Sequence, residues 1–395
     1  MLWFTWVIAN MCMWMGDVAA TWVMTTLTTQ PIWIALVQTA ATLPIFLLGL
    51  PSGALADMLD RKRFLLASQA LVAILFAGTS AAIFLDLLTP GWLLALTLAG
   101  GIGTAMRWPV FVAMVSESVP RSQLPAALAL NGLPMNGSRI FGPLLAGLLI
   151  TSVGSGWVFL LNALFSCLAL WIIARWPRSP DSPMTRKESL PAAMRAGVQF
   201  VWHSRMLKSV LLRTSVFFLH ATALQALLPL KAQQLDGGGP RVFTLLLAGM
   251  GMGAMLGIFM LEQLRRRINR DAMLLGATLV QAVAMGLLIA APWLPLAFGA
   301  MCLAGLAWIV VVNTLAVSAQ MNLPDWVRAR GMSMFQMAIM GSSALAAALW
   351  GQIATWGSVQ LALGLAALGS LPAMWLAARY GPIHDSSGPV PWRQD

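Results

Sequence analysis

Five ionisable side chains stand inside long apolar runs of this 395-residue sequence: Asp17, Arg107, Arg139, Arg213 and His220. A charged side chain at the centre of a bilayer costs about 2.5–3.5 kcal/mol on insertion scales, so such residues usually face a cavity or one another. Together they offer a carboxylate that can carry a proton, an imidazole that can accept and donate one, and three cations for an anionic ligand. This set of groups is typical of a transport path.

Each of the first three charges has two interpretations. Asp17 lies near the middle of the first apolar run and is the leading candidate for a proton site, because a carboxyl can alternate between burial and pairing with a cation. Its alternative is a permanent salt bridge with Arg139 or Arg107 that fixes helix packing. Arg139 is a candidate for binding an anionic cargo or neutralising Asp17. Arg107 is a candidate for the cavity wall, unless its long side chain extends to the membrane surface.

The remaining candidates are also open to a packing interpretation. Arg213 lies toward one end of its apolar run, and His220 lies near the middle of the same run, where a hydrogen-bonded packing role is the alternative to proton transfer. Trp22 and Trp308 lie deep in their runs, unlike most of the 18 tryptophans, which fall near the ends as interfacial belts do. We expect both indoles either to contact an aromatic cargo or to pack in the core.

The composition indicates what positions these side chains. The chain is 59% hydrophobic and 9% charged, whereas a soluble domain carries about 25% charged residues, so a soluble, disordered or nucleic-acid-binding protein is disfavoured. Roughly 20 apolar residues cross a bilayer as a helix. The sequence therefore predicts an all-α polytopic membrane protein with twelve transmembrane helices, near 3–27, 33–55, 64–86, 91–115, 126–152, 156–175, 207–230, 241–262, 272–291, 295–318, 331–354 and 357–379.

The positions of the basic residues predict the orientation. Most of the 24 lysines and arginines fall in loops that lie on one side if the N-terminus is inside, and only Lys231 and Arg241 fall in loops on the other side. The positive-inside rule then places both termini in the cytoplasm. The expected location of the protein is the inner membrane of the cell. No basic residue precedes Arg61, so the first run is a retained helix rather than a signal peptide. We also expect a short leader before Met1.

A shift of 204 residues reveals an internal repeat. The two strings Arg61-Lys62-Arg63 and Arg265-Arg266-Arg267 coincide under this shift, and several glycines and prolines follow: Gly49 with Gly253, Gly53 with Gly257, Gly101 with Gly305, Pro120 with Pro324, and Gly147 with Gly351. The sequence thus predicts two six-helix pseudo-repeat halves, as in many transporters. The expected boundaries are an N-terminal half at 1–175, a cytoplasmic linker at 176–204, a C-terminal half at 205–380 and a cytoplasmic tail at 381–395. Within the linker, Ser189–His203 is predicted to form a surface helix.

The loop after the second predicted helix carries a recognisable motif. Its sequence from Gly53 to Arg63 resembles the loop signature of the major facilitator superfamily, and the matching positions are Gly53, Asp57, Arg61 and Lys62. Asp60 replaces the usual second glycine. Because an acidic side chain at a helix end pairs with basic groups, we interpret these residues as a latch on the cytoplasmic side. The alternative is a solvated charged turn.

The fifth predicted helix carries a second motif. Asn136, the pair Gly142-Pro143 and Gly147 are similar to the glycine–proline signature of the exporters in this superfamily. A Gly-Pro pair inside a span bends a helix and frees a carbonyl, which neighbouring helices can satisfy. We therefore treat these residues as a helix-bend motif.

Shorter strings in the first half resemble the drug-efflux and siderophore-export branch of the superfamily, among them Gly16-Asp17, Leu43-Pro44, Val119-Pro120-Arg121 and Ala129-Leu130-Asn131. The resemblance implies a proton-coupled exporter of a small amphipathic compound, siderophore- or drug-like, that works by alternating access. An importer or facilitator on the same fold and a lipid flippase are the nearest alternatives. A membrane sensor or assembly partner that does not transport is the alternative from a different class.

Several kinds of chemistry leave no trace in the sequence. There is no phosphate-binding glycine-rich loop, no metal-spaced cluster of His and Cys, and no nucleophile motif. We therefore expect no enzyme, no cofactor and no metal, and transport powered by an ion gradient. The expected partners are the lipid bilayer, a small-molecule cargo and protons, with no nucleic acid, and we expect the chain to act as a monomer.

Overall fold

The computed structural model describes residues 2–58, 60–118, 124–175, 203–235 and 237–381, with residues 199 and 383. Within these ranges it describes the backbone but not the side chains at 2, 50, 53–58, 61, 108–109, 111–118, 124–136, 325–326 and 329. The predicted linker helix Ser189–His203 therefore lies almost wholly outside the described residues.

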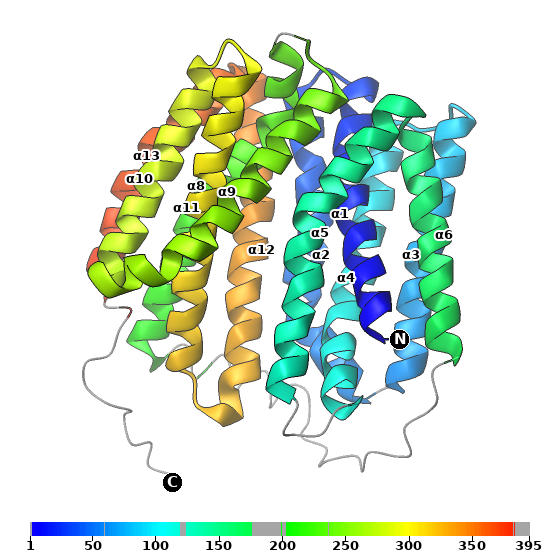
Figure 1. The fold of residues 1–395 in the computed structure, drawn as a ribbon, viewed down its shortest axis with the longest axis horizontal. Helices are drawn as coiled ribbons and strands as arrows, with labels where there is room; N and C mark the ends of the chain where they lie inside the picture. The colour runs from blue at the N-terminus through cyan, green and yellow to red at the C-terminus, as the bar shows by residue number, and fades with distance from the viewer. Residues whose placement is uncertain are drawn as a thin grey trace.

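Long helices account for nearly all of the described chain (Figure 1). The first six are α1 (Leu2–Leu27), α2 (Pro31–Met58), α3 (Arg61–Phe84), α4 (Pro90–Ser118), α5 (Leu124–Ser152) and α6 (Ser155–Arg175). The other six are α8 (Arg205–Gln234), α9 (Pro240–Arg267), α10 (Arg270–Ala290), α11 (Leu294–Met321), α12 (Asp325–Trp356) and α13 (Val359–Tyr380). Each contains one of the twelve predicted spans to within a few residues.

Ten of the twelve helices in the described part of the chain are long and apolar enough to cross a membrane. The other two are α4 and α5, whose side chains are described only in part. In lipid a helix satisfies every backbone group within its own segment, so each apolar run folds into one. The predicted all-α, polytopic fold class is confirmed.

The two halves repeat one helical plan. α4 and α11 begin 204 residues apart, as do α6 and α13, which is the shift that aligns the sequence with itself. Figure 1 shows α1–α6 gathered on one side of the molecule and α8–α13 on the other. We call the end of the bundle where α6 ends at Arg175 and α8 begins at Arg205 the linker end, and the opposite end the far end.

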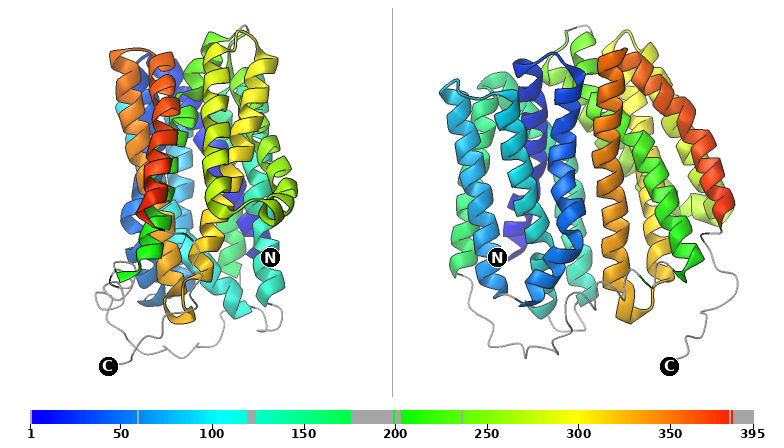
Figure 2. Two further views of the ribbon diagram at one scale, coloured as in Figure 1. Left: turned by 90° about the vertical axis from the view of Figure 1, so that its left-hand side faces the viewer. Right: turned by 180° about the vertical axis from the view of Figure 1, so that it is seen from behind.

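The halves meet mainly where α2 packs on α12 and α5 packs on α9, and the view from behind in Figure 2 shows α2 beside α12. Thr39 Oγ1 donates a hydrogen bond to the Ala344 carbonyl at 2.8 Å, and the Ile32 amide donates to Thr355 Oγ1 at 3.0 Å. Both bonds join α2 to α12. Their position indicates that the halves are closely packed along this seam from the far end toward the middle.

Three glycines in α9 serve packing within one half. A Cβ on Gly249, Gly253 or Gly257 would collide with α11, at Phe298, Cys302 and Ile309 respectively. Small residues at this spacing let helix backbones approach closely. Gly49 of α2 differs, because a Cβ there would lie 3.1 Å from Met337 Cγ of α12, across the seam between the halves.

Candidate functional site

Arg139 lies where the two halves meet. This α5 side chain places its guanidinium carbon 4.9 Å from the ring centroid of Trp308 in α11 and 5.7 Å from that of Trp14 in α1. Both distances fall within the range of a cation–π contact, about 6 Å. One cation therefore touches an aromatic ring of each half, and two predicted site residues, Arg139 and Trp308, are brought together.

Aromatic side chains surround this cation. Trp308 packs edge-on against Phe218 of α8, with ring centroids 4.7 Å apart. The indole N–H of Trp14 is buried and has no hydrogen-bond partner among the side chains and backbone that the structure describes. Among the residues that the structure describes, no carboxylate lies within 4.0 Å of the Arg139 guanidinium. Arg139 and Trp14 thus present one cation and one N–H donor, surrounded by aromatic rings, to a ligand that binds here.

Trp14 is a residue that sequence reasoning missed. It precedes Asp17 by three residues, so the two side chains project from the same face of α1. A Cβ on Gly142 would lie 2.6 Å from Trp14 Cβ, so glycine at this position lets α1 and α5 approach closely beside Arg139. The three-residue spacing between Trp14 and Asp17 is the feature of the sequence that could have identified Trp14 as a site residue.

Asp17 itself is partly buried on α1. Its backbone carbonyl accepts a hydrogen bond from Thr21 Oγ1 at 2.7 Å. Within the described ranges its carboxylate has no ion-pair partner within 4.0 Å, so this conformation contains no salt bridge to Arg139 or Arg107. The role of Asp17 as a proton site stays a prediction.

Arg107 points into the N-terminal half instead of extending to the surface. It is 7% exposed, and its Nη1 donates to Gln69 Oε1 of α3 at 3.2 Å. Gln69 Nε2 donates to the Ser166 carbonyl of α6 at 3.4 Å, and Asn162 Nδ2 of α6 donates to the Cys12 carbonyl of α1 at 3.1 Å. These bonds join α1, α3, α4 and α6 through buried polar side chains within the N-terminal half.

Arg213 anchors three helices of the C-terminal half. This α8 side chain is 1% exposed and forms an ion pair with Asp271 at the start of α10. Its Nη2 donates to the carbonyls of Ala378 at 3.1 Å and Gly381 at 2.7 Å, at the end of α13. A cation here also complements the negative end of the α13 dipole. All of its observed contacts hold helices together.

We expect Arg213→Met to lower the stability of the protein in detergent by about 3–5 kcal/mol, because removing one partner of a buried ion pair costs about that much. Thermal unfolding followed by circular dichroism measures the change. The matched control is Arg266→Met, since Arg266 pairs with Glu262 on an exposed surface, where such pairs contribute about 0–1 kcal/mol. Equal shifts in the two variants would contradict the anchoring role.

His220 is held by a local hydrogen bond. Its Nδ1 lies 2.8 Å from the Val216 carbonyl, one turn earlier on α8. The imidazole lies against Trp350 of α12, with ring centroids 6.1 Å apart, and Trp350 Nε1 donates to the Leu219 carbonyl at 2.6 Å. These contacts fit the packing interpretation of His220.

Trp22 takes part in the seam between the halves. It is 8% exposed and stacks on Phe243 of α9, with centroids 6.1 Å apart and planes 24° from parallel. Nearby, Gly147 of α5 packs directly on Thr244 of α9, where any Cβ would collide. Trp22 and the motif residue Gly147 therefore help to close the far end in this conformation.

The loop motif is described only in part. At Gly53, Asp57 and Arg61 the structure describes only the backbone, and the same holds for Asn136 in the helix-bend motif. Lys62 Nζ donates to the Ala174 carbonyl at 2.8 Å, which ties α3 to the end of α6. The latch therefore stays a prediction.

Asp60 has a role that the motif comparison did not predict. This residue replaces the usual glycine, and its Oδ1 accepts a hydrogen bond from the Arg63 amide at 3.0 Å. It is thus the N-cap of α3, a position that aspartate favours. An aspartate directly before the string Arg61-Lys62-Arg63 is the feature of the sequence that could have predicted this N-cap.

Comparison with known proteins agrees with this architecture. The family described as transmembrane secretion effector matches residues 1–383. The enterobactin exporter EntS of Salmonella typhi is 27% identical over 267 residues, 67% of this chain and 62% of that protein, so the match spans less than two thirds of this relative. EntS of Escherichia coli O127:H6 is 26% identical over 306 residues, 76% of this chain and 71% of that protein.

Solved structures share the fold. The nucleoside transporter NupG has a TM-score of 0.77 at 12% identity, covering 96% of this chain and 98% of that one. A bacterial homologue of the human lysosomal transporter Spinster has a TM-score of 0.69 at 16% identity, covering 96% and 94%. The helical plan, the repeat and the family match lead to one conclusion: the chain belongs to the transmembrane secretion effector family of major facilitator superfamily transporters.

Proposed function

We propose that the protein is a proton-coupled exporter of a small amphipathic compound, siderophore- or drug-like, and that it works by alternating access. The observation that carries this proposal is the contact of Arg139 with Trp14 and Trp308, one ring from each half. If the halves rock about a central site, the distance from Arg139 to Trp308 must change. The contacts of a cargo bound there would therefore change with the conformation of the transporter.

The chemistry of this site supports the cargo class. In the described region the Arg139 guanidinium has no carboxylate partner and the Trp14 indole N–H has no acceptor. Both groups suit an acceptor-rich or anionic cargo group. The surrounding rings suit an apolar or aromatic one. The relatives are named as exporters of enterobactin, which supports export and a siderophore-like cargo.

Proton coupling is proposed for Asp17. It shares a face of α1 with Trp14, so a proton on Asp17 and a cargo at Arg139 would occupy neighbouring positions. Because its carboxylate lacks an ion pair among the described side chains, its charge is not compensated in this conformation. Binding of a proton would remove that charge without breaking an existing contact.

In the proposed orientation the protein spans the inner membrane, and its linker end faces the cytoplasm. Arg63, Arg175, Arg205, the string Arg265–Arg267 and Arg379 all belong to this end of the helices. Such a concentration of basic residues is typical of the cytoplasmic side.

We expect Arg139→Gln to weaken cargo binding about 10- to 100-fold, because a charge-assisted hydrogen bond contributes about 1.5–3 kcal/mol. Arg139→Lys keeps the charge but loses the planar stacking surface, so binding should be intermediate. Calorimetry with siderophores and lipophilic dyes measures the affinity, and dye accumulation in overproducing cells measures export.

The control is Arg266→Gln, which alters an exposed arginine and should leave affinity and export unchanged. Unaltered binding in Arg139→Gln would remove this residue from the cargo site. Raised rather than lowered dye in cells that produce the wild type would reverse the proposed direction and favour an importer.

A further inference from the structure

The aromatic rings around Arg139 form a cation-binding position. The Arg139 guanidinium carbon lies within cation–π distance of the rings of Trp14 and Trp308. Trp308 in turn packs edge-on against Phe218 and Phe217, with centroids 4.7 and 6.4 Å apart, and both phenylalanines are buried. Aromatic faces that share one cation are the arrangement by which proteins bind quaternary ammonium ligands. In this protein the cation at that position belongs to the chain itself.

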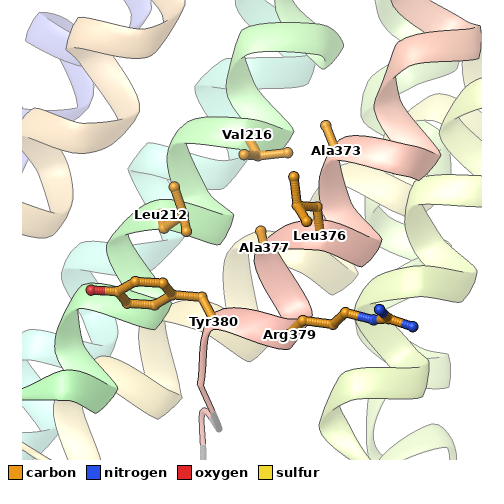
Figure 3. A pocket seen from close by; sticks show the side chains of 7 residues that line it. All are labelled: Leu212, Val216, Ala373, Leu376, Ala377, Arg379 and Tyr380. Carbon is orange, nitrogen blue, oxygen red and sulfur yellow. The ribbon is translucent and has the colours of Figure 1, made fainter.

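This arrangement differs from two other arginine–tryptophan contacts of the chain. Arg175 lies over Trp171 at 4.1 Å and Arg379 lies over Trp375 at 3.6 Å. Each of these pairs belongs to a single helix, one turn apart, and Figure 3 shows Arg379 extending outward at the end of α13. Such a contact fixes one side chain locally. Arg139 instead reaches rings on two other helices, one from each half, so its rings can serve a ligand that binds between the halves.

The internal repeat separates a packing role of Arg139 from a role in ligand selection. Phe218 of α8 stands 204 positions after Trp14, and Ser343 of α12 stands 204 positions after Arg139. The Ser343 hydroxyl accepts a hydrogen bond from Thr222 Oγ1 of α8 at 3.2 Å. The equivalent pair of helices in the C-terminal half therefore packs closely with a small neutral side chain at this position. The helical plan does not require an arginine here.

We propose that Arg139 is a specificity-determining residue whose guanidinium occupies the cation-binding position on Trp14 and Trp308, so that the wild-type site rejects organic cations and accepts anions. The inference rests on the proposed function, because it concerns the same cargo site. A cationic ligand would have to displace Arg139 from its rings and would be repelled by a like charge, which is strong in a low-dielectric interior. A neutral residue at position 139 leaves the rings and the Asp17 carboxylate, which shares a face of α1 with Trp14, and both favour a cation.

Calorimetry of the purified full chain with phenyltrimethylammonium tests this role, because the ligand is a permanent cation with a head group similar in size to a guanidinium. We expect Arg139→Gln to bind it about tenfold more tightly than the wild type does, as expected for a cation that gains contact with two aromatic rings. Arg139→Lys keeps a cation at this position and should bind it no better than the wild type. The neutral compound of the same shape, tert-butylbenzene, should show no comparable gain in Arg139→Gln.

Two double variants identify the source of the gain. Trp308→Leu added to Arg139→Gln removes one ring and should abolish the gain, whereas Asp17→Asn added to Arg139→Gln should leave part of it, because the rings remain. A gain that is lost with Asp17→Asn but kept with Trp308→Leu would assign it to net charge and overturn the inference. Equal affinity of the wild type and Arg139→Gln for phenyltrimethylammonium would also overturn it.

These outcomes are separate from the test of the proposed function. Weaker binding of an anionic cargo in Arg139→Gln, without tighter binding of the cation, would support the cargo site and contradict the selectivity role. Tighter binding of the cation, with no binding of any siderophore by the wild type, would do the reverse. Size-exclusion profiles show whether Arg139→Gln folds, and Arg139→Ser, which matches the equivalent Ser343 of the other half, replaces it if it does not.

Discussion

Asp17→Asn is expected to abolish proton-driven accumulation of cargo while leaving cargo exchange across the membrane intact. Asparagine preserves the shape of the side chain but cannot bind and release a proton. For one proton exchanged per cargo, a pH difference of one unit supports about tenfold accumulation, and the variant should show none. Inverted membrane vesicles measure both quantities, one with an imposed pH gradient and the other by counterflow without a gradient.

The matched control for this experiment is Glu262→Gln. Glu262 is also a carboxylate at the membrane, but it is exposed and paired with Arg266, so its loss should leave accumulation unchanged. Proton-driven accumulation at the wild-type level in Asp17→Asn would place the proton site elsewhere. Absence of any flux in the wild type, with a cellular phenotype that survives Asp17→Asn, would instead favour a sensor or assembly partner.

Gly305→Leu is expected to prevent folding of the C-terminal half. A Cβ at this position of α11 would collide with the Met250 carbonyl of α9, and a Cβ on Gly253 would collide with the Cys302 carbonyl in return. Because backbone atoms cannot move aside as side chains do, the two helices would have to separate. We expect the monodisperse peak in fluorescence-detected size exclusion to be lost, and the smaller change Gly305→Ala to cost about 1–3 kcal/mol.

Gly299→Leu is the control for that experiment, because it lies on the same helix and a Cβ there would meet nothing within 4 Å. Its size-exclusion profile should match the wild type. A Gly305→Leu variant that folds normally would show that α9 and α11 are not held at this distance in the membrane. Misfolding of both variants would show that α11 tolerates no large residue, whatever its position.

The internal repeat was the strongest evidence in the sequence. One shift of 204 aligned a triple-basic string and several glycines, and the helix starts of α4 and α11 follow it. The glycines of α9 were harder to interpret, because spacing alone does not distinguish packing within a half from sliding between halves. The structure places Gly253 against α11 and Gly49 against α12, so the same residue type serves both surfaces.

The three arginines in the apolar runs make different kinds of contact, and the periodicity of the sequence does not predict which arginine makes which contact. Arg139 contacts rings of both halves, Arg107 points toward Gln69 inside one half, and Arg213 bonds to the end of α13. All three are arginines in apolar runs. What separates them is the rotation of each helix about its axis, and a helix that is apolar on nearly all sides carries no stripe from which that rotation can be read.

The sequence by itself therefore determined that this is a membrane protein whose described residues form twelve long helices in two repeated halves. The bilayer forces each apolar run to satisfy its backbone hydrogen bonds internally, and length and hydropathy are then sufficient. Only the tertiary structure decided which side chains meet. The contacts of Arg139 with Trp14 and Trp308 join segments more than a hundred residues apart, and they depend on how the helices are rotated and how closely their small residues let them pack.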